Sequence, residues 1–482
     1  MEVIETTRHH RPERSDLLRF LGACRDAAAE DGHWKVASIS LRVRHIDPLA
    51  VLETIYEPGE HHAYLESPSA GRAIAGADAV VLGEWTGGDR FERARAFADE
   101  VLEHTVAVGD VGEPMGGPHF LGAFTFLDDP GADSPFPGAT VFLPRWQVAQ
   151  SGGAYVAVAN CRIDAGSDIE AVVDRIWAAH GRFSSFAYDI PVLRAAGTVC
   201  LERKEVVSCR RGVCGFRERV EEALQRIEAG EYEKIVLARA LDLRFSAPLR
   251  PLETADCLRN RFPSCHIFSY ANGCGQSLIG ATPERLAETD GRRLRTEAIA
   301  GSAARGSGAM EDARLAGRLL HSEKDRREHE HVVASIRRRL AQVGLRWDGA
   351  GAEPRLLDLP NVRHLHTPIE VDLPETVDLL SVAAALHPTS AVGGTPRDRA
   401  VADIVDLEPF PRGLYAGLVG WFNHRRAGEW VVAIRSALVE GSGARLFAGA
   451  GIVRGSDPDR EFAETEVKMR ALLDAITEEN SV

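Results

Sequence analysis

Two periodicities of hydrophobic residues alternate irregularly along the chain. Long helices are predicted over residues 310–343 and 459–477, and apolar side chains recur three and four positions apart over residues 16–31, 90–104 and 216–229. This spacing places them on one face of a helix. The pattern therefore predicts amphipathic helices in both halves of the chain, with two long ones near the C-terminal end.

Short runs rich in β-branched and aromatic residues lie between these segments and predict strands. They read PHFLGAFTFL, ATVFLPRWQV and AYVAVANCRI in the first half, and KIVLARALDL, CHIFSYA, SLIGAT, RLRTEAI, GLVGWF, EWVVAIRSALV and RLFAGAGIV in the second. Gln150-Ser151-Gly152-Gly153 joins two of them and predicts a hairpin. Because strands and helices do not alternate in a regular βαβ rhythm, we predict an α+β fold with large antiparallel sheets.

The composition changes twice along the chain. Residues 1–16 are polar, so we expect a flexible N-terminus. A second change near residue 200 separates residues 17–200 from residues 201–480. We therefore expect the chain to have an N-terminal part and a C-terminal part after this flexible start.

Charge and composition exclude several classes of protein. The 482 residues are 44% apolar and carry a formal net charge of −14, which argues against a general nucleic-acid binder. A local basic pocket for a small anion stays compatible with this charge. The longest apolar stretches are too short to span a bilayer, and the first residues lack the apolar core of a signal peptide. We expect a cytoplasmic protein that binds neither nucleic acid nor membrane.

The cysteines do not predict a zinc site. Eight cysteines are scattered through the chain, and none forms a C-x-x-C pair. Cys209 and Cys214 are close together, but no matching second pair follows them. We expect reduced and mostly buried thiols.

Two helices carry acidic residues three positions apart. Asp325 and Glu328 lie in HSEKDRREHEH, and Glu461 and Glu464 lie in EFAETEVK, with Lys468 one turn further on. A solvated charged helix face explains either pair alone. Together, four oxygen donors on two helices also suit Mg²⁺, with water and substrate oxygens completing the shell.

Four further positions are candidates for chemistry. Lys234 begins an apolar strand, where an inward lysine would have a lowered pKa and act as a base, or would extend to solvent from the strand end. Glu284 follows a strand at a turn, a place where a carboxyl can be held as a proton donor. Arg435 interrupts an apolar strand, and a buried arginine needs an anion. Gly449-Ala450-Gly451 does not match a dinucleotide fingerprint, but it allows the backbone to approach a ligand closely.

These segments also resemble a known family. The strings KIVLAR, GATPERL, EAIAGS, SEKDRREHE, HPTSAVGGTP, RGLYAGLVGW, AIRSA, AGAGIV and DPDREFAETEVK occur in this order over residues 230–470. They resemble the chorismate-utilising enzymes, which include isochorismate synthases, salicylate synthases and anthranilate synthase large subunits. The resemblance implies a sandwich of two large antiparallel sheets with flanking helices and the active site between them. It also implies that residues 17–200, whose own likeness is weak, complete the same fold.

The resemblance implies roles for particular residues. Lys234 corresponds to the general base that activates water, and Glu284 to the general acid. Glu328 and Glu464 correspond to Mg²⁺ ligands, with Asp325 and Glu461 acting through water. The residues that correspond to the chorismate site are Gly301, Ser302, Ala391, Tyr415, Arg435, Gly449 and Lys468.

Within this family, three positions favour an isochorismate synthase, which is an isomerase. Anthranilate synthases commonly carry glutamine where Lys234 stands. Aminodeoxychorismate synthases carry a lysine in a P-I-K-G motif, where this chain reads Ala298-Ile299-Ala300-Gly301. Salicylate synthases usually have threonine where Ala391 stands.

Two alternatives stay open beside the isochorismate synthase. One is a salicylate synthase, and the other is a catalytically silent chorismate-binding protein. We expect no glutamine amidotransferase subunit, because water is the nucleophile. The sequence does not choose between menaquinone, siderophore and salicylate-derived products.

Overall fold

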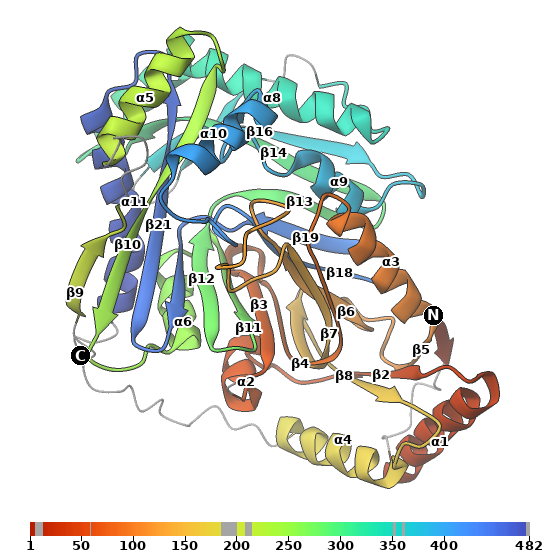
Figure 1. Cartoon of the computed structure of the whole chain (residues 1–482). Helices are drawn as coiled ribbons and strands as arrows, with labels where there is room; N and C mark the ends of the chain where they lie inside the picture. The colour runs from red at the N-terminus through yellow and green to blue at the C-terminus, as the bar shows by residue number, and fades with distance from the viewer. Residues whose placement is uncertain are drawn as a thin grey trace.

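The strands of the computed structural model form a network in which two arms diverge from a shared pair, β4 (Arg72–Trp85) and β7 (Ala139–Ser151). The structure describes residues 1–4, 13–57, 59–184, 200–207, 215–349, 353–358 and 362–478. Except where β5 pairs with β1 and β2, all pairings among these residues are antiparallel. Figure 1 shows the two arms opening away from each other toward the end of the molecule that carries α8.

The first arm runs from β4 through the strands that carry Lys234 and Gly449. In spatial order its strands are β3 (His61–Ser67), β11 (His266–Asn272), β12 (Gln276–Thr282), β20 (Ser436–Glu440), β21 (Gly443–Val453), β10 (Lys234–Phe245) and β9 (Cys200–Glu205). The short β17 (Gly394–Thr395) pairs with the start of β10.

The second arm runs from the first half of β7. In spatial order its strands are β6 (His119–Phe124), β18 (Leu418–Asn423), β19 (Ala427–Val432), β13 (Arg285–Asp290), β14 (Arg293–Ala304), β16 (Val362–Asp372) and β15 (Arg355–Asp358). The predicted α+β class with large antiparallel sheets is confirmed. The two arms are the two sheets, and hydrogen bonds through β4 and β7 join them into one network.

A smaller branch extends from the second half of β7. It contains β8 (Ala154–Ile163), β2 (Lys35–Arg42), β5 (Thr105–Gly109) and β1 (Glu2–Ile4). The predicted hairpin is present, because Ser151 pairs with Ala154 across Gly152 and Gly153. β1 and the start of α1 fall in the segment expected to be flexible, and residues 5–12 of that segment lie outside the described residues.

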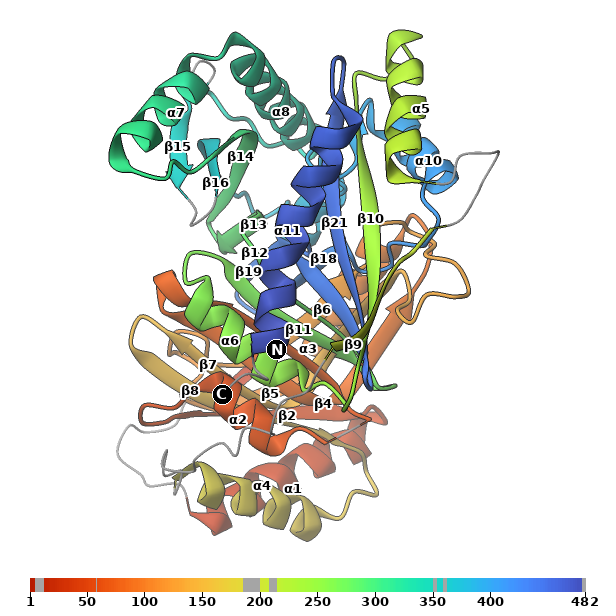
Figure 2. The same cartoon turned by 90° about the vertical axis from the view of Figure 1, so that its left-hand side faces the viewer.

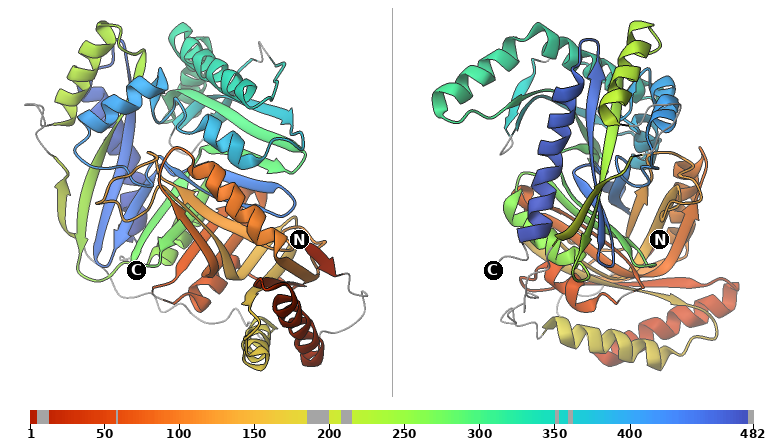
Figure 3. Two further views of the ribbon diagram at one scale, coloured as in Figure 1. Left: turned by 45° about the vertical axis from the view of Figure 1, so that its right-hand side comes forward. Right: turned by 60° about the vertical axis from the view of Figure 1, so that its left-hand side comes forward.

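Helices cover both arms. They are α1 (Arg14–Asp31), α2 (Pro48–Ile55), α3 (Arg90–Glu103), α4 (Ile169–Ser184), α5 (Phe216–Glu228), α6 (Pro251–Arg261), α7 (Ala309–His321), α8 (Glu323–Gln342), α9 (Leu379–Leu386), α10 (Arg397–Leu407) and α11 (Pro458–Glu478), with one 3₁₀ turn at Pro68–Ala70. α11 lies along β21, as Figure 2 shows. Both views in Figure 3 place α1 and α4 side by side at the end remote from α8. Among the described helices, none is long and apolar enough to cross a membrane.

One predicted helix is two helices in the structure. The helix predicted over residues 310–343 is interrupted at Ser322, which has an extended backbone between α7 and α8. The Ser322 hydroxyl accepts a hydrogen bond from the Asp325 backbone N–H over 3.3 Å, so it caps the first turn of α8. This break fixes where α8 begins, and Asp325 and Glu328 follow directly.

One predicted strand is also two strands. The segment EWVVAIRSALV ends as β19 at Val432 and restarts as β20 at Ser436, so the chain crosses from the second arm to the first. Arg435 lies in this crossover with a φ of +52°, which no strand residue adopts. Arg435, which the sequence placed inside one apolar strand, therefore lies in the connection between the two arms.

A second crossover lies beside the first. Pro283 and Glu284 connect β12 in the first arm to β13 in the second. The two crossovers are hydrogen-bonded, because Val432 N–H donates to the Glu284 carbonyl over 2.9 Å and Ala281 N–H donates to the Arg435 carbonyl over 3.2 Å. This pairing holds Glu284 and Arg435 at fixed positions where the arms diverge.

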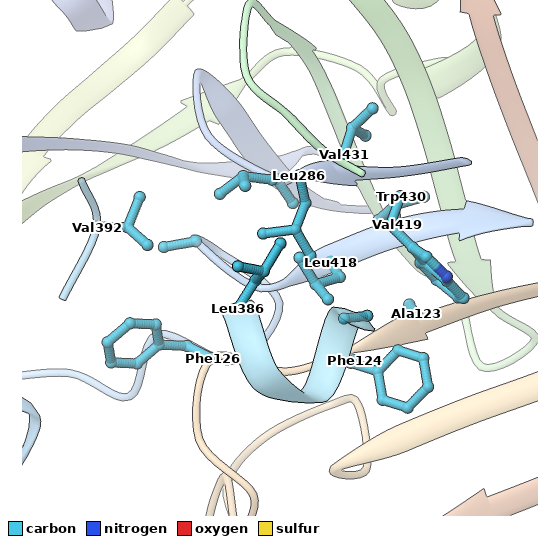
Figure 4. Close-up of a cluster of buried hydrophobic side chains, with 14 of the residues drawn as sticks. Ala123, Phe124, Phe126, Leu286, Leu386, Val392, Leu418, Val419, Trp430 and Val431 are labelled. Atoms are coloured by element: carbon cyan, nitrogen blue, oxygen red, sulfur yellow. The ribbon is translucent and has the colours of Figure 1, made fainter. Parts of the chain in front are cut away.

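The largest core cluster fills the space around α9 and the second arm. Phe124, Leu286, Leu418 and Trp430 are buried and gather with Leu386 of α9 in Figure 4. The Phe124 and Trp430 rings meet edge to face with centroids 5.1 Å apart. This buried packing holds the strands of the second arm that flank the crossovers.

Candidate active site

A polar cavity of about 280 Å³ lies between the two arms, and all of the residues expected from the sequence to serve the site line it. β10 contributes Lys234, and the crossovers contribute Glu284 and Arg435. α8 contributes Asp325 and Glu328, and α11 contributes Glu461, Glu464 and Lys468. The other expected residues that line the cavity are Gly301, Ser302, Ala391, Tyr415 and Gly449. The structure therefore collects residues up to 234 positions apart in one pocket (Lys234 to Lys468).

Lys234 lies at the start of β10 and points into the cavity. Its ammonium donates a hydrogen bond to Glu328 Oε1 over 3.0 Å, and its side chain is only 13% exposed. Burial favours the neutral form of Glu328, but the Lys234 ammonium outweighs burial and holds the pKa of this carboxyl below its ordinary value. Lys234 is therefore an inward residue of the pocket and does not extend to solvent from the strand end.

Gly451 provides the room for this lysine. A Cβ at position 451 would lie 3.0 Å from Lys234 Cε, and one at Gly449 would lie 3.0 Å from the Tyr415 hydroxyl oxygen. The glycine-rich segment of β21 thus lets two pocket side chains lie against its backbone.

Glu284 is held as a carboxyl in an apolar setting. Burial raises its pKa to about 7, the nearby Glu297 adds to this rise, and a hydrogen bond from Thr389 opposes it. That bond runs from Thr389 Oγ1 to Glu284 Oε1 over 3.2 Å. A carboxyl with a pKa near neutrality can donate a proton at physiological pH.

Arg435 provides a cation that forms no ion pair with a described acid, although the nearby Glu464 carboxylate favours its charged form. Among the described residues its guanidinium forms no hydrogen bond, while its backbone carbonyl is held by Ala281. Burial lowers the pKa of its guanidinium, but arginine stays charged at neutral pH. The pocket therefore presents a guanidinium free to pair with an anion.

Lys468 and Glu464 form an ion pair on α11. Lys468 Nζ lies 2.5 Å from Glu464 Oε1 and donates to the Gly449 carbonyl over 2.8 Å. Burial lowers the pKa of Lys468, although Glu464 opposes this. Burial also raises the pKa of Glu461, and the neighbouring Glu464 contributes to the rise.

The backbone of β14 forms the opposite wall. Gly301 has a φ of +75° at a bulge, and a Cβ there would lie 3.1 Å from the Asp325 Cβ. Ser302 Oγ lies 2.8 Å from His364 Nδ1 of β16. A glycine is required at 301 because a larger residue would be strained and would press against α8.

The carboxylates of the pocket suit a hard cation. Asp325 and Glu328 come from α8, and Glu461 and Glu464 come from α11. The pKa of Glu461 is raised chiefly by burial, with a smaller contribution from Glu464. In the described part of the chain, no three histidine, cysteine or acidic residues are grouped closely enough to hold a metal by themselves. Mg²⁺ is usually held by one or two carboxylates, with waters and substrate oxygens completing its shell, so this donor set fits Mg²⁺ completed by a substrate.

Two pocket residues were missed from the sequence. Arg412 is buried, donates to the Val236 and Val392 carbonyls over 2.7 and 2.8 Å, and pairs with Glu408. His364 lines the pocket, and burial together with Arg435 and Lys468 lowers its pKa to about 4, so it is neutral at pH 7. Arg412 stands in the motif RGLYAGLVGW beside Tyr415, which was a usable signal, whereas a lone histidine in a strand gives none.

Reduced thiols were expected, and Cys24, Cys161, Cys200, Cys265 and Cys274 are free thiols. Only Cys24, Cys161 and Cys265 of these are buried, while Cys200 is half-buried and Cys274 is exposed. Burial raises the pKa of Cys24, Cys161 and Cys265 to about 11, so these thiols are neutral. Cys209 and Cys214 lie outside the described residues.

Residues 21–477 match the family model described as "Chorismate binding enzyme", and the chain belongs to this family. It is 31% identical over 403 residues to the isochorismate synthase MenF of Bacillus subtilis, an alignment that covers 82% of this chain and 80% of that protein. It is 32% identical to the isochorismate synthase EntC of Escherichia coli, over 73% of this chain and 90% of that protein. It is also 36% identical to component 1 of the anthranilate synthase of Streptomyces coelicolor, but over only 54% of this chain and 51% of that protein.

Solved structures show the same fold. The menaquinone-specific isochorismate synthase MenF of Escherichia coli superposes with a TM-score of 0.75 at 25% identity, over 95% of this chain and 99% of that one. Component I of the anthranilate synthase of Streptococcus pneumoniae superposes with a TM-score of 0.64 at 21% identity, over 84% of this chain and 92% of that one. The fold is therefore shared by family members that differ in reaction, and the site must distinguish them.

Proposed function

We propose that this chain is an isochorismate synthase, an isomerase that interconverts chorismate and isochorismate. Water adds at C2 of the ring while the hydroxyl at C4 leaves. The observation that carries the proposal is that Lys234 and Glu284 line one cavity together with a free guanidinium and two acidic helices. The names of the relatives aligned over most of this chain support the same reaction.

The proton transfers in this reaction fit the two side chains. Lys234 is assigned to take a proton from the water that attacks C2, and protonated Glu284 gives its proton to the hydroxyl that leaves C4 as water. The ring double bonds shift between these positions, so no redox partner is needed. Burial keeps the pKa of Glu284 near 7, which leaves much of it protonated at neutral pH.

The remaining residues hold the substrate. Arg435 forms no ion pair with a described acid and is assigned to a carboxylate of chorismate, with Lys468 in the same pocket. Ala391, Tyr415 and the backbone at Gly301, Ser302 and Gly449 are assigned to the walls around the ring. Mg²⁺ held by Glu328 and Glu464, with Asp325 and Glu461 acting through water, would offset the charge of the second carboxylate.

The product of the purified chain tests this proposal. With chorismate and Mg²⁺ it should form isochorismate and approach an equilibrium mixture, without stoichiometric pyruvate. Salicylate and pyruvate as the main products at neutral pH would assign a salicylate synthase instead. Anthranilate formed with ammonium would exclude both, and chorismate binding without any product would indicate a silent binding protein.

We further propose that the chain acts without a glutamine amidotransferase subunit, because water needs no ammonia donor. Activity of the isolated chain would support this. A cytoplasmic location is also proposed, since Cys24, Cys161, Cys200, Cys265 and Cys274 are reduced thiols. The relatives include a menaquinone-specific enzyme and one of salicylate biosynthesis, so the proposal concerns the shared reaction and no single pathway.

A further inference from the structure

A second cavity of about 280 Å³ shares part of its lining with the polar pocket and is also lined by residues of α6 and α11. Six residues line both cavities, namely Pro283, Ser302, His364, Arg435, Glu464 and Lys468. Every residue that lines this second cavity alone is apolar, chiefly Leu258, Phe262, Cys265, Val467, Ala471 and Leu472. We call this cavity the apolar chamber.

The apolar chamber has no polar group of its own to hold water or an ion. Its thiol stays neutral, because burial raises the pKa of Cys265 to about 11. Val467, which also lines the chamber, is 63% exposed. The polar pocket already contains every residue proposed to act on chorismate, so the chamber is additional space beside that site.

Among the described charged residues that line the chamber, Arg435 has no ion-pair partner. Arg435 forms no hydrogen bond through its guanidinium with the described residues, and the crossover fixes its backbone. A guanidinium binds a carboxylate through two parallel N–H···O bonds. The other two charged residues of the lining, Glu464 and Lys468, form an ion pair with each other. A ligand with a carboxylate at Arg435 and a flat apolar body would fill the chamber and pair with the one described cation of the lining that has no ion-pair partner.

We propose that the apolar chamber binds the ring of an aryl carboxylate whose carboxylate pairs with Arg435. Because Arg435 is shared with the polar pocket, such an acid competes with chorismate for the same guanidinium. The chamber is thus an inhibitory site, and its occupant differs from the substrate in carrying an aromatic ring and a single carboxylate.

Binding of a simple probe tests this without any turnover. 3-Phenylpropionate is titrated calorimetrically into the full chain in the absence of chorismate and Mg²⁺, beside propionate, which lacks the ring, and 3-phenylpropan-1-ol, which lacks the carboxylate. Burial of the ring and pairing of the carboxylate each predict a loss of roughly tenfold or more in affinity when either group is missing. If propionate or the alcohol binds as well as 3-phenylpropionate, the proposal is wrong.

A matched pair of variants locates the site. Ala471→Phe fills the chamber and should weaken 3-phenylpropionate roughly tenfold, with the Michaelis constant for chorismate unchanged. Ala463→Phe, on an exposed position of the same helix, should change neither. Unchanged probe binding in folded Ala471→Phe would overturn the proposal, and if that variant does not fold, the three-probe comparison decides. Because the binding assay contains no chorismate, its outcome is independent of which reaction the enzyme catalyses.

Discussion

The ammonium of Lys234 donates a hydrogen bond to Glu328 Oε1 over 3.0 Å, linking the start of β10 to the second turn of α8. The proposed base and a proposed metal ligand are therefore direct neighbours. A cation bound at Glu328 would compete for this carboxylate, so the two groups have to be tested separately. The first two predictions do this.

The first prediction concerns the base. Lys234→Gln should lower turnover roughly 10²-fold or more, the usual scale for loss of a general base. Chorismate binding should survive, because Arg435 and Lys468 remain. Steady-state kinetics and direct binding measure the two effects, and Lys204→Gln at an exposed position is the control. If Lys234→Gln converted chorismate to isochorismate at a near-normal rate, this lysine would not be the base.

The second prediction concerns the metal. Glu328→Gln and Glu464→Gln should abolish Mg²⁺-dependent turnover and weaken Mg²⁺ binding measured by calorimetry, with the fold retained. Excess EDTA should inactivate the unaltered chain, and zinc should substitute poorly for oxygen-only ligands. Glu330 is exposed on α8, the helix that carries Glu328, and Glu330→Gln should behave like the unaltered chain. Full activity in EDTA would exclude the metal site.

Regular local patterns were readable from the sequence. The acidic residues on α8 and α11 are three apart, so their shared faces followed from helix geometry alone. The 150–153 hairpin followed from its glycines. The family motifs then indicated which distant segments meet, which no local pattern can do.

The breaks in these patterns were not readable. Residues 321–331 contain neither an apolar residue nor a glycine or proline, so the sequence there has no helix breaker and only the cap shows that α7 and α8 are separate. Val432 to Ser436 has a strand composition, yet the chain changes arms there and Arg435 adopts a left-handed backbone. Both are decided by tertiary packing, which overrides local propensity.

The third prediction concerns pH. Since Glu284 must be protonated to donate, kcat/KM for chorismate should fall as pH rises past about 7. The Thr389 hydrogen bond lowers the pKa of Glu284, so Thr389→Val should move this alkaline limb to higher pH. Thr296→Val, which removes a buried hydroxyl bonded to the Leu286 carbonyl, is the control. A limb that stays in place in Thr389→Val would mean that another group controls it.

The fourth prediction separates stability from activity. The folded-state pKa of Glu284 lies above that of an exposed glutamate, so the folded chain binds more protons and loses stability as pH rises from about 4.5 to about 7. Glu284→Gln cannot ionise and should avoid this loss, by at most about 3 kcal/mol above pH 7. It should unfold at a higher temperature than the unaltered chain at pH 8, but not at pH 4, and it should lack turnover. A lower melting temperature of Glu284→Gln at pH 8 would contradict the assignment of a buried carboxyl with a raised pKa.

The last prediction connects the α8 cap to the metal site. Ser322→Ala removes the hydroxyl that accepts from Asp325 N–H, which should cost about 1 kcal/mol of stability. Because Asp325 and Glu328 lie in the first two turns of α8, fraying there should also raise the Mg²⁺ concentration needed for half-maximal activity. Ser322→Thr keeps a capping hydroxyl and should restore both properties.

A second cap provides the control for general destabilisation. Asp378 caps α9 by accepting from Ser381 N–H over 2.9 Å, and it does not line the polar pocket. Asp378→Ala should therefore lower the melting temperature without changing the Mg²⁺ requirement. Thermal unfolding and Mg²⁺ titrations of activity on the three variants measure both effects. If Ser322→Ala lost stability but kept its Mg²⁺ requirement, the start of α8 would not position the metal ligands, and the link between cap and site would fail.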